Sequence, residues 1–345
     1  SGVIGIADEQ PFRGAYSSVG KLMSEFQVYV DDVSAIETPS PVSGTQGDII
    51  TYRQAWAVFH ANTVALVRTT WRWNGMQLVP VNVEVLPVFS ASAYGQYLKG
   101  LDRRNPGKAV ADAIDNYMAR FELQPQAIRE LAFKEFREFH LLLADSIAST
   151  ATAPAQPGAL MGDGAKPTPT GHGAGFLQVY SGEGMFNIVP DPEFYRKTFA
   201  GMLSHEYTQF LELDANEHTA PYARDASMVI PLGEVGARVA AWEHYLRSYP
   251  HSAFADEARL HYIWLLSAFL AGTNNTPHAD YATRTVSTSA LQALDEHVRF
   301  YPGTASAVAA GQAAEIYRRN KTVTDAVRTR IMKLVDEAVK ASFGS

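Results

Sequence analysis

The amino-acid sequence predicts a mainly α-helical protein with minor β structure, in which an N-terminal helical domain is followed by an array of stacked helix pairs. Three observations support this prediction. Apolar residues recur at helical spacing through much of the chain, a segment rich in Ala, Pro, Gly and Thr separates two halves, and a Tyr-Pro motif is repeated in the second half. A short alternating segment accounts for the minor β structure.

The composition is that of a globular protein. The 345 residues are 46% hydrophobic and 19% charged, which excludes global disorder because a substantial core can form. The formal net charge is −7 without a cluster of Lys or Arg, so no nucleic-acid partner is expected. The apolar runs are shorter than the roughly 18 residues that a transmembrane helix needs, so no transmembrane helix is expected. The absence of cysteine excludes disulfides, Cys-ligated metals and thiol nucleophiles.

Two helices are expected first. Apolar side chains three and four residues apart predict a helix over 15–37, which Pro39 ends because proline lacks an amide donor. This stripe is formed by Tyr16, Val19, Met23, Phe26, Val30 and Val33. A second helix is predicted from Asp48, a good N-cap residue, to Asn74-Gly75, which readily adopt left-handed dihedrals.

The pattern then changes. Apolar and other residues alternate from Val79 to Phe89, which predicts a strand, and Pro80 restricts this strand to the edge of a sheet. Helices are predicted again from about Ala109 and from Pro125, because apolar residues return to helical spacing.

The chain is expected to divide into a helical domain over 1–148, a linker over 149–175 and a repeat domain over 176–345. The linker is inferred from composition, since its few large apolar side chains cannot offset the entropy lost on ordering. Two short apolar runs flank Ser181-Gly182-Glu183-Gly184 directly after it and predict a small β-hairpin.

An internal repeat is the strongest signal in the sequence. The segment Tyr249–Ala258 aligns with Tyr301–Ala310, with Tyr-Pro first, Ser or Thr fourth, and Ala seventh and tenth. The segment 220–226 is a weaker copy without Tyr-Pro, and the copies are unevenly spaced. The residues expected to define the repeat are Tyr249, Pro250, Ser252, Ala255 and Ala258, with Tyr301, Pro302, Thr304, Ala307 and Ala310 as their counterparts.

Each repeat position has a structural role. Proline disfavours the helical conformation of the preceding tyrosine, so one helix ends there. Ser252 or Thr304 is expected to cap the next helix, and the alanines allow the paired helix to approach closely. Larger residues of the following helix fill the space between neighbouring pairs, namely Tyr262, Leu265, Leu266 and Phe269. Such a pair buries both of its faces only by stacking on similar pairs.

The Tyr-Pro-x-Ser-x-x-Ala-x-x-Ala pattern resembles the tetratricopeptide-type (TPR-like) repeats of Gram-negative envelope proteins, including outer-membrane assembly lipoproteins and the Tol–Pal-associated periplasmic protein. The resemblance covers about 192–341. It implies a TPR-like α-solenoid, a protein-binding role and a location in the cell envelope. The 301 copy lacks the acidic pair found at Asp256-Glu257.

No catalytic residue, metal or cofactor is predicted. His205-Glu206 begins like a zinc-protease motif, but Gln209 stands where the second histidine belongs. Glu257 and His261 share one helix face, for which an ordinary polar surface is the favoured interpretation. Nucleophile-elbow, phosphate-loop and dinucleotide fingerprints are absent from the sequence.

Four tryptophans are candidate protein-binding residues: Trp71, Trp73, Trp242 and Trp264. In Trp71-Arg72-Trp73 the two rings cannot both face one helical stripe, so one is expected at the surface, where aromatic residues beside arginine anchor interfaces. Core packing is the competing interpretation for each of the four.

The leading hypothesis is a non-enzymatic protein- or peptide-binding scaffold of the bacterial cell envelope. One alternative is an envelope-polymer hydrolase or lyase supported by the helical array, which would use two carboxylates or a carboxylate with His205, Glu206 and His205 being the candidate pair. A small-ligand receptor is another. The chain begins at Ser1 without methionine, so we expect an upstream segment, either a lipoprotein leader with a lipid anchor or an expression tag. The expected location is the periplasm or the outer membrane, with the cytoplasm as the alternative.

Overall fold

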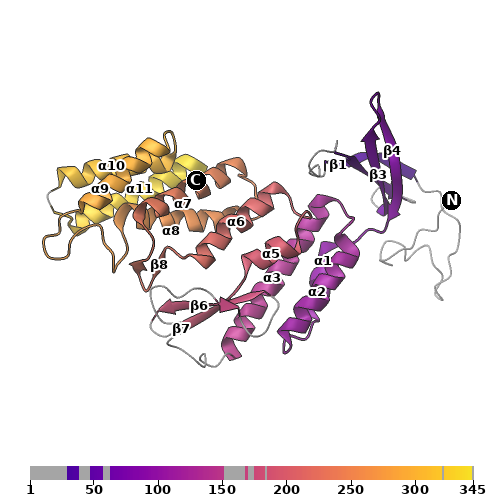
Figure 1. The fold of residues 1–345 in the computed structure, drawn as a ribbon, viewed down its shortest axis with the longest axis horizontal. Coiled ribbons are helices and arrows are strands. Elements are labelled where there is room, and N and C mark those ends of the chain that lie inside the picture. Colours follow the sequence, from indigo (N-terminus) through magenta and orange to yellow (C-terminus); the bar gives the residue numbers. More distant parts are fainter. Residues whose placement is uncertain are drawn as a thin grey trace. The chain divides into compact units, whose positions relative to one another are not determined.

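The computed structural model describes residues 29–38, 47–56, 63–150, 168–169, 175–182, 185–320 and 322–343. The protein is mainly α-helical with minor antiparallel β structure, as predicted (Figure 1). It divides into two compact units, Ser1–Ser146 with Phe199–Ser204, and Ile147–Thr198 with His205–Ser345. Among the described helices, none combines the length and the apolar character needed to span a bilayer.

Strands, not helices, form the described start of the first unit. They are β1 (Tyr29–Glu37), β2 (Ile49–Trp56), β3 (Thr63–Trp73) and β4 (Leu78–Leu86), antiparallel in the order β1-β2-β3-β4. The helix predictions are therefore wrong over 29–37, 49–56 and 63–73. The remainder of the first predicted helix, with Tyr16, Val19, Met23 and Phe26, lies outside the described residues.

The error has a physical reason. The apolar and β-branched residues of this region also fit a period of two, and Ile50, Tyr52 and Leu66 together form the buried face of the sheet. Pairing between strands decides between the helical period and the two-residue period. It satisfies the backbone hydrogen-bonding groups and buries the apolar face of the sheet at the same time. The strand predicted from Val79 is confirmed as β4, and its proline lies in an edge strand as expected.

Three helices complete the first unit: α1 (Ala91–Lys99), α2 (Pro106–Phe121) and α3 (Gln126–Thr150). The helices predicted from about Ala109 and from Pro125 are thereby confirmed. Asn105 caps α2 by accepting the backbone N–H of Lys108. Arg129 of α3 reaches Glu37 of β1 at 3.2 Å, which connects the helices with the sheet inside this unit.

The second unit begins with a small antiparallel sheet of β5 (Thr168–Pro169), β6 (Phe176–Gly182) and β7 (Met185–Pro190). The strands β6 and β7 confirm the predicted hairpin. Of the predicted linker, 151–167 and 170–174 lie outside the described residues. The helices α5 (Pro192–Thr198) and α6 (His205–Thr219) follow.

The predicted third repeat copy is wrong. Ala223–Arg224 form the strand β8, paired with β9 (Ser227–Met228), instead of starting a helix. The two residues between these strands, Asp225 and Ala226, have φ of 47° and 53°, which is a hairpin turn. The helix α6 ends at Thr219, directly before this segment, but the segment lacks the Tyr-Pro pair and forms a β-hairpin where the other two copies begin a second helix.

Five helices form the rest of the unit: α7 (Leu232–Ser248), α8 (Ala255–Ala271), α9 (Thr288–Phe300), α10 (Ala305–Arg319) and α11 (Asp325–Phe343). Within each hairpin, α7 packs on α8 and α9 on α10, while α7 also contacts α9 and α8 contacts α10. The two hairpins therefore lie side by side with like helices adjacent, and α11 packs on both α8 and α10 (Figure 1).

Candidate functional site

The two Tyr-Pro motifs form equivalent corners in the two hairpins. Tyr249 ends α7 with φ −131° and ψ 65°, and Tyr301 ends α9 with φ −123° and ψ 50°. Each tyrosine donates its backbone N–H to the carbonyl oxygen four residues earlier, Tyr245 at 2.9 Å and His297 at 3.0 Å. The prolines Pro250 and Pro302 thus occupy the same place relative to their helices, as the repeat predicts.

The residues after the corners behave differently in the two copies. Thr304 caps α10 as predicted, because its Oγ1 accepts the backbone N–H of Ala307 at 3.1 Å. Ser252 is not the N-cap residue that the repeat predicts, since α8 begins only at Ala255 after Phe254. Its hydroxyl still accepts a backbone N–H, that of Phe254 at 3.1 Å, and also bonds the Tyr245 hydroxyl at 2.7 Å. The repeat alanines are buried as expected (Ala258, Ala307 and Ala310), while Ala255 is half-buried.

A buried carboxylate joins the hairpins. Glu243 of α7 is 1% exposed and accepts the backbone N–H groups of Ala305 at 2.7 Å and Ser306 at 3.0 Å. These amides are two of the unsatisfied donors of the first turn of α10, where the helix dipole favours a negative charge. Sequence reasoning missed this residue, because nothing in the local pattern indicates that α7 meets the start of α10.

His297 of α9 lies beside the same joint. Its Nε2 contacts the Ser306 hydroxyl at 3.1 Å, and burial lowers the pKa of His297 to about 4, against the opposing charge of Glu243. A Cβ atom at Gly236 of α7 would lie 3.0 Å from Nδ1 of His297 and 2.9 Å from the Phe269 ring. Glycine at that position therefore lets the two helices meet with the imidazole between them.

The four candidate tryptophans are not equivalent. Trp242 is fully buried, so its ring is not available at a surface, and its indole N–H donates to Glu217 at 3.2 Å. Trp264 of α8 is 54% exposed. In the first unit, Trp71 is partly buried and donates to the Thr51 hydroxyl at 2.8 Å, whereas Trp73 is exposed.

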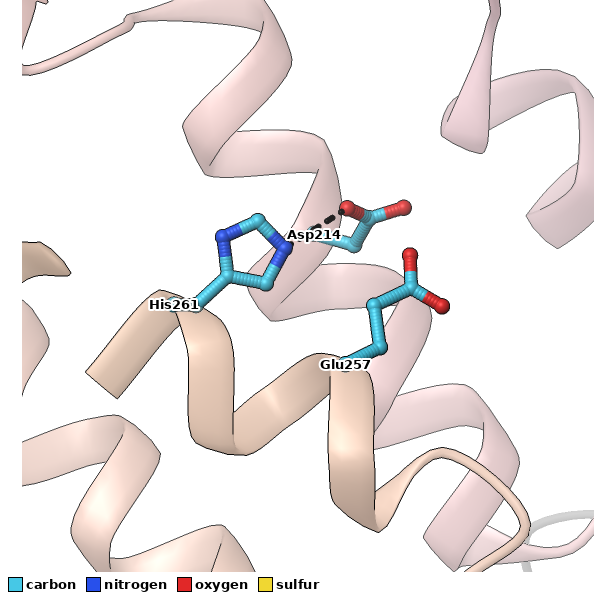
Figure 2. A group of neighbouring side chains, drawn as sticks. All are labelled: Asp214, Glu257 and His261. Carbon is cyan, nitrogen blue, oxygen red and sulfur yellow. Dashed lines mark ion pairs between the residues drawn. The ribbon is translucent and has the colours of Figure 1, made fainter. Parts of the chain in front are cut away.

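The structure brings three titratable side chains of the second unit together. Asp214 of α6 faces Glu257 and His261 of α8, and one ligand atom of each lies within 4.8 Å of those of the others (Figure 2). Asp214 is buried and the other two are half-buried. Of this group, the sequence indicated only that Glu257 and His261 share a helix face. Asp214 has no sequence relation to them and was missed.

Aromatic stacking fixes the imidazole of this group. The His261 ring stacks on Trp242 with a centroid distance of 4.7 Å and an interplanar angle of 12°. The Trp242 ring is in turn held by its bond to Glu217, which Arg238 contacts at 3.2 Å. In this position Nε2 of His261 lies 3.6 Å from Oδ1 of Asp214, the contact drawn in Figure 2.

An apolar ridge adjoins the group on the outer side of α8. Leu260 and Trp264, one helical turn apart, are 49% and 54% exposed. The Trp264 ring packs edge-on against His261, with a centroid distance of 6.2 Å. Exposed apolar side chains thus lie next to imidazole and carboxylate groups on one surface of a regular helix.

The candidate pair His205 and Glu206 does not belong to this group. Both residues stand in the first turn of α6, and Asp214 follows about 12 Å further along the helix axis. Nothing in their described surroundings assembles a catalytic constellation around them.

Comparison with known protein families gives a match within the first unit. The YybI C-terminal domain family matches residues 8–86, a segment that includes the described strands β1–β4. No curated protein matches the chain, and no solved structure matches it either. The helical array of the second unit lies outside the matched segment.

Proposed function

We propose that this chain is a non-enzymatic protein- or peptide-binding scaffold of the bacterial cell envelope, with a TPR-like helical array as its binding part. The single observation that carries the binding role is the exposure of Leu260 and Trp264 on the outer side of α8. Large aromatic side chains on rigid elements are frequent anchors of protein interfaces, because they bury much area at little entropic cost.

The repeat itself does not require this exposure. The position of α10 that aligns with Trp264 is Ile316, which is 8% exposed, and the position that aligns with Leu260 is Gln312. Of the two positions at which the first hairpin exposes apolar side chains, the second hairpin therefore has one buried residue, Ile316, and one polar residue, Gln312. This difference favours a binding role for the α8 ridge over a role in stacking the hairpins.

The charges around the ridge suggest the chemistry of its partner. Asp256, whose side chain is fully exposed and only 3.6 Å from the guanidinium of Arg259, lies one turn before Leu260 on α8, and the chain as a whole carries a net charge of −7. We therefore propose that the partner is a peptide segment with two features. An apolar side chain would pack on the ridge of Leu260 and Trp264, and a neighbouring basic side chain would lie near Asp256 in the first turn of α8. The proposed envelope location rests on the resemblance of the Tyr-Pro motifs to the repeats of Gram-negative envelope proteins. If it is correct, we expect the gene to encode a secretion signal upstream of residue 1.

Peptide selection on the purified full chain tests the proposal. Peptides enriched from a random displayed library are synthesised, and their dissociation constants are measured by titration calorimetry. We expect Trp264→Ala to weaken binding by about 10-fold or more, as for an interface anchor. Phe300→Ala is the matched control, because Phe300 is also an exposed aromatic residue but lies on α9. Failure to enrich any peptide, or equal affinity for the Trp264→Ala variant, contradicts the proposal.

A further inference from the structure

We infer that Asp214, Glu257 and His261 form a binding site for a divalent transition-metal ion, with Zn²⁺ as the ion that fits best. The inference is independent of the peptide-binding role. The sequence alone predicts no metal, because the local pattern does not show that Asp214 faces α8. The argument rests on donor geometry, on donor chemistry and on the side chains that hold the donors in place.

The distance between the donor atoms of His261 and Asp214 fits two ligands of one metal ion better than it fits a hydrogen bond. Nε2 of His261 and Oδ1 of Asp214 are 3.6 Å apart, which is longer than a normal hydrogen bond. Two ligand atoms on one tetrahedral zinc ion lie about 3.3 Å apart, given metal–ligand distances near 2.0–2.1 Å. The third ligand atom, from Glu257, is within 4.8 Å of the other two, a gap that a change in the rotamer of its half-buried side chain closes.

The donor set suits a borderline divalent cation. One imidazole nitrogen with two carboxylate oxygens is a set that binds Zn²⁺ and its first-row neighbours, whereas Ca²⁺ and Mg²⁺ prefer oxygen ligands alone. Three protein ligands leave at least one coordination position open, and the half-buried Glu257 and His261 leave that position accessible to water. Binding by a site with these ligands requires neutral imidazole and ionised carboxylates.

Second-layer contacts orient two of the three ligands. His218, one turn after Asp214 on α6, lies with its Nδ1 2.8 Å from the backbone oxygen and 3.2 Å from Oδ1 of Asp214. Because a carbonyl oxygen only accepts, Nδ1 of His218 carries the proton and donates to this residue. The imidazole of His261, the second ligand, is held in place by its stacking on the Trp242 ring. Such outer partners commonly fix the ligands of protein metal sites.

The surrounding charges are consistent with a cation between the carboxylates. Asp214 and Glu257 bring two negative charges into a partly desolvated space, and the imidazoles of His261 and His218 both face Asp214. The nearby guanidinium of Arg238 is engaged with Glu217 and Glu234. A divalent ion would balance the two carboxylates and remove much of their mutual repulsion.

Metal titration of the purified, metal-stripped full chain tests the inference. Zn²⁺ binding is followed by calorimetry, and Co²⁺ binding by the visible absorption that tetrahedral nitrogen and oxygen ligation produces. We expect saturable binding of one ion per chain. Glu257→Gln and His261→Gln are each expected to weaken Zn²⁺ binding by at least about 10-fold, and His218→Gln by about 10-fold through loss of orientation.

Matched controls separate this site from adventitious histidine binding. His251→Gln and Glu212→Gln change exposed residues of the same types near α8 and on α6, and both should bind Zn²⁺ as the unmodified chain does. Asp214→Asn is added with circular dichroism as a check on folding, since Asp214 is buried. The inference is overturned if saturable binding is absent, or if folded Glu257→Gln and His261→Gln bind Zn²⁺ with unchanged affinity.

Discussion

The carboxylate of Glu243 accepts the backbone N–H of Ser306 at 3.0 Å, although 63 residues separate the two in the chain. This bond, with the parallel bond to Ala305, links α7 of one hairpin to the start of α10 in the next. A buried charged acceptor that satisfies two backbone amides stabilises the fold strongly, and its removal leaves both amides without that acceptor.

Replacement of Glu243 should destabilise the protein strongly. We expect Glu243→Ala to lower the free energy of unfolding by about 3 kcal/mol, because the buried N–H of Ser306 and the partly buried N–H of Ala305 lose their acceptor. Asp295→Asn is the matched control, since Asp295 aligns with Glu243 in the second hairpin but forms an exposed ion pair with Arg318. It should change stability by less than about 1 kcal/mol. Urea denaturation measures the unfolding free energy of both variants. Equal losses in the two variants would contradict a stabilising role for the bonds from Glu243 to α10.

Acidification should destabilise the protein through His297. The pKa of His297 is about 4 in the folded chain because of burial, whereas an unfolded histidine has a pKa of about 6.5. Between these values the unfolded chain binds a proton that the folded chain does not, so the free energy of unfolding decreases as the pH falls from about 6.5 to about 4. Burial also lowers the pKa of His278, which acts in the same direction.

A variant isolates the contribution of His297. In His297→Gln the dependence of the unfolding free energy on pH should be shallower between about pH 4 and 6.5, because one titrating group is removed. The control His244→Gln changes an exposed histidine of α7 and should keep the slope of the unmodified protein. Urea denaturation at a series of pH values provides the comparison, and an unchanged slope in His297→Gln would contradict the assignment.

Gly272 should not tolerate a side chain. It ends α8 with φ 74° and ψ −177°, a region accessible almost only to glycine, and a Cβ atom there would lie 2.6 Å from the Thr276 backbone oxygen. We expect Gly272→Ala to destabilise the protein by about 2 kcal/mol or more. Gly233→Ala in the first turn of α7 meets no atom within 4 Å and should be neutral or slightly stabilising. Similar thermal melting temperatures for both variants would count against this prediction.

The two repeat hydroxyls should respond differently to substitution. Thr304→Ala removes a helix cap and should cost about 1 kcal/mol, whereas Thr304→Ser keeps the cap and should cost little. Ser252→Ala removes a buried bond to the Tyr245 hydroxyl instead, so the Ser252→Ala, Tyr245→Phe double variant should be less destabilised than the sum of the single variants. Strict additivity of the pair would be inconsistent with this contact.

Features encoded by neighbouring residues were predictable from the sequence. The mainly α-helical class, the β4 edge strand, the β6–β7 hairpin and the two Tyr-Pro corners all follow from local dihedral preferences and apolar spacing, and each is confirmed. The assignment failed where local signals were ambiguous. In 49–56 and 63–73 the same apolar residues fit both a helix and a strand, and only pairing with neighbouring strands decides the outcome.

Contacts between distant residues were decided by the tertiary structure alone. Asp214 meets His261, and Glu243 meets Ser306, because helices that are far apart in the chain pack together. A carboxylate on a helix surface has the same local pattern whether it faces water, a metal ligand or a helix N-terminus. The sequence by itself thus determined where the helix pairs of the second unit turn. Long-range packing determined which side chains became buried partners, since burial and charge pairing depend on neighbours that no local pattern specifies.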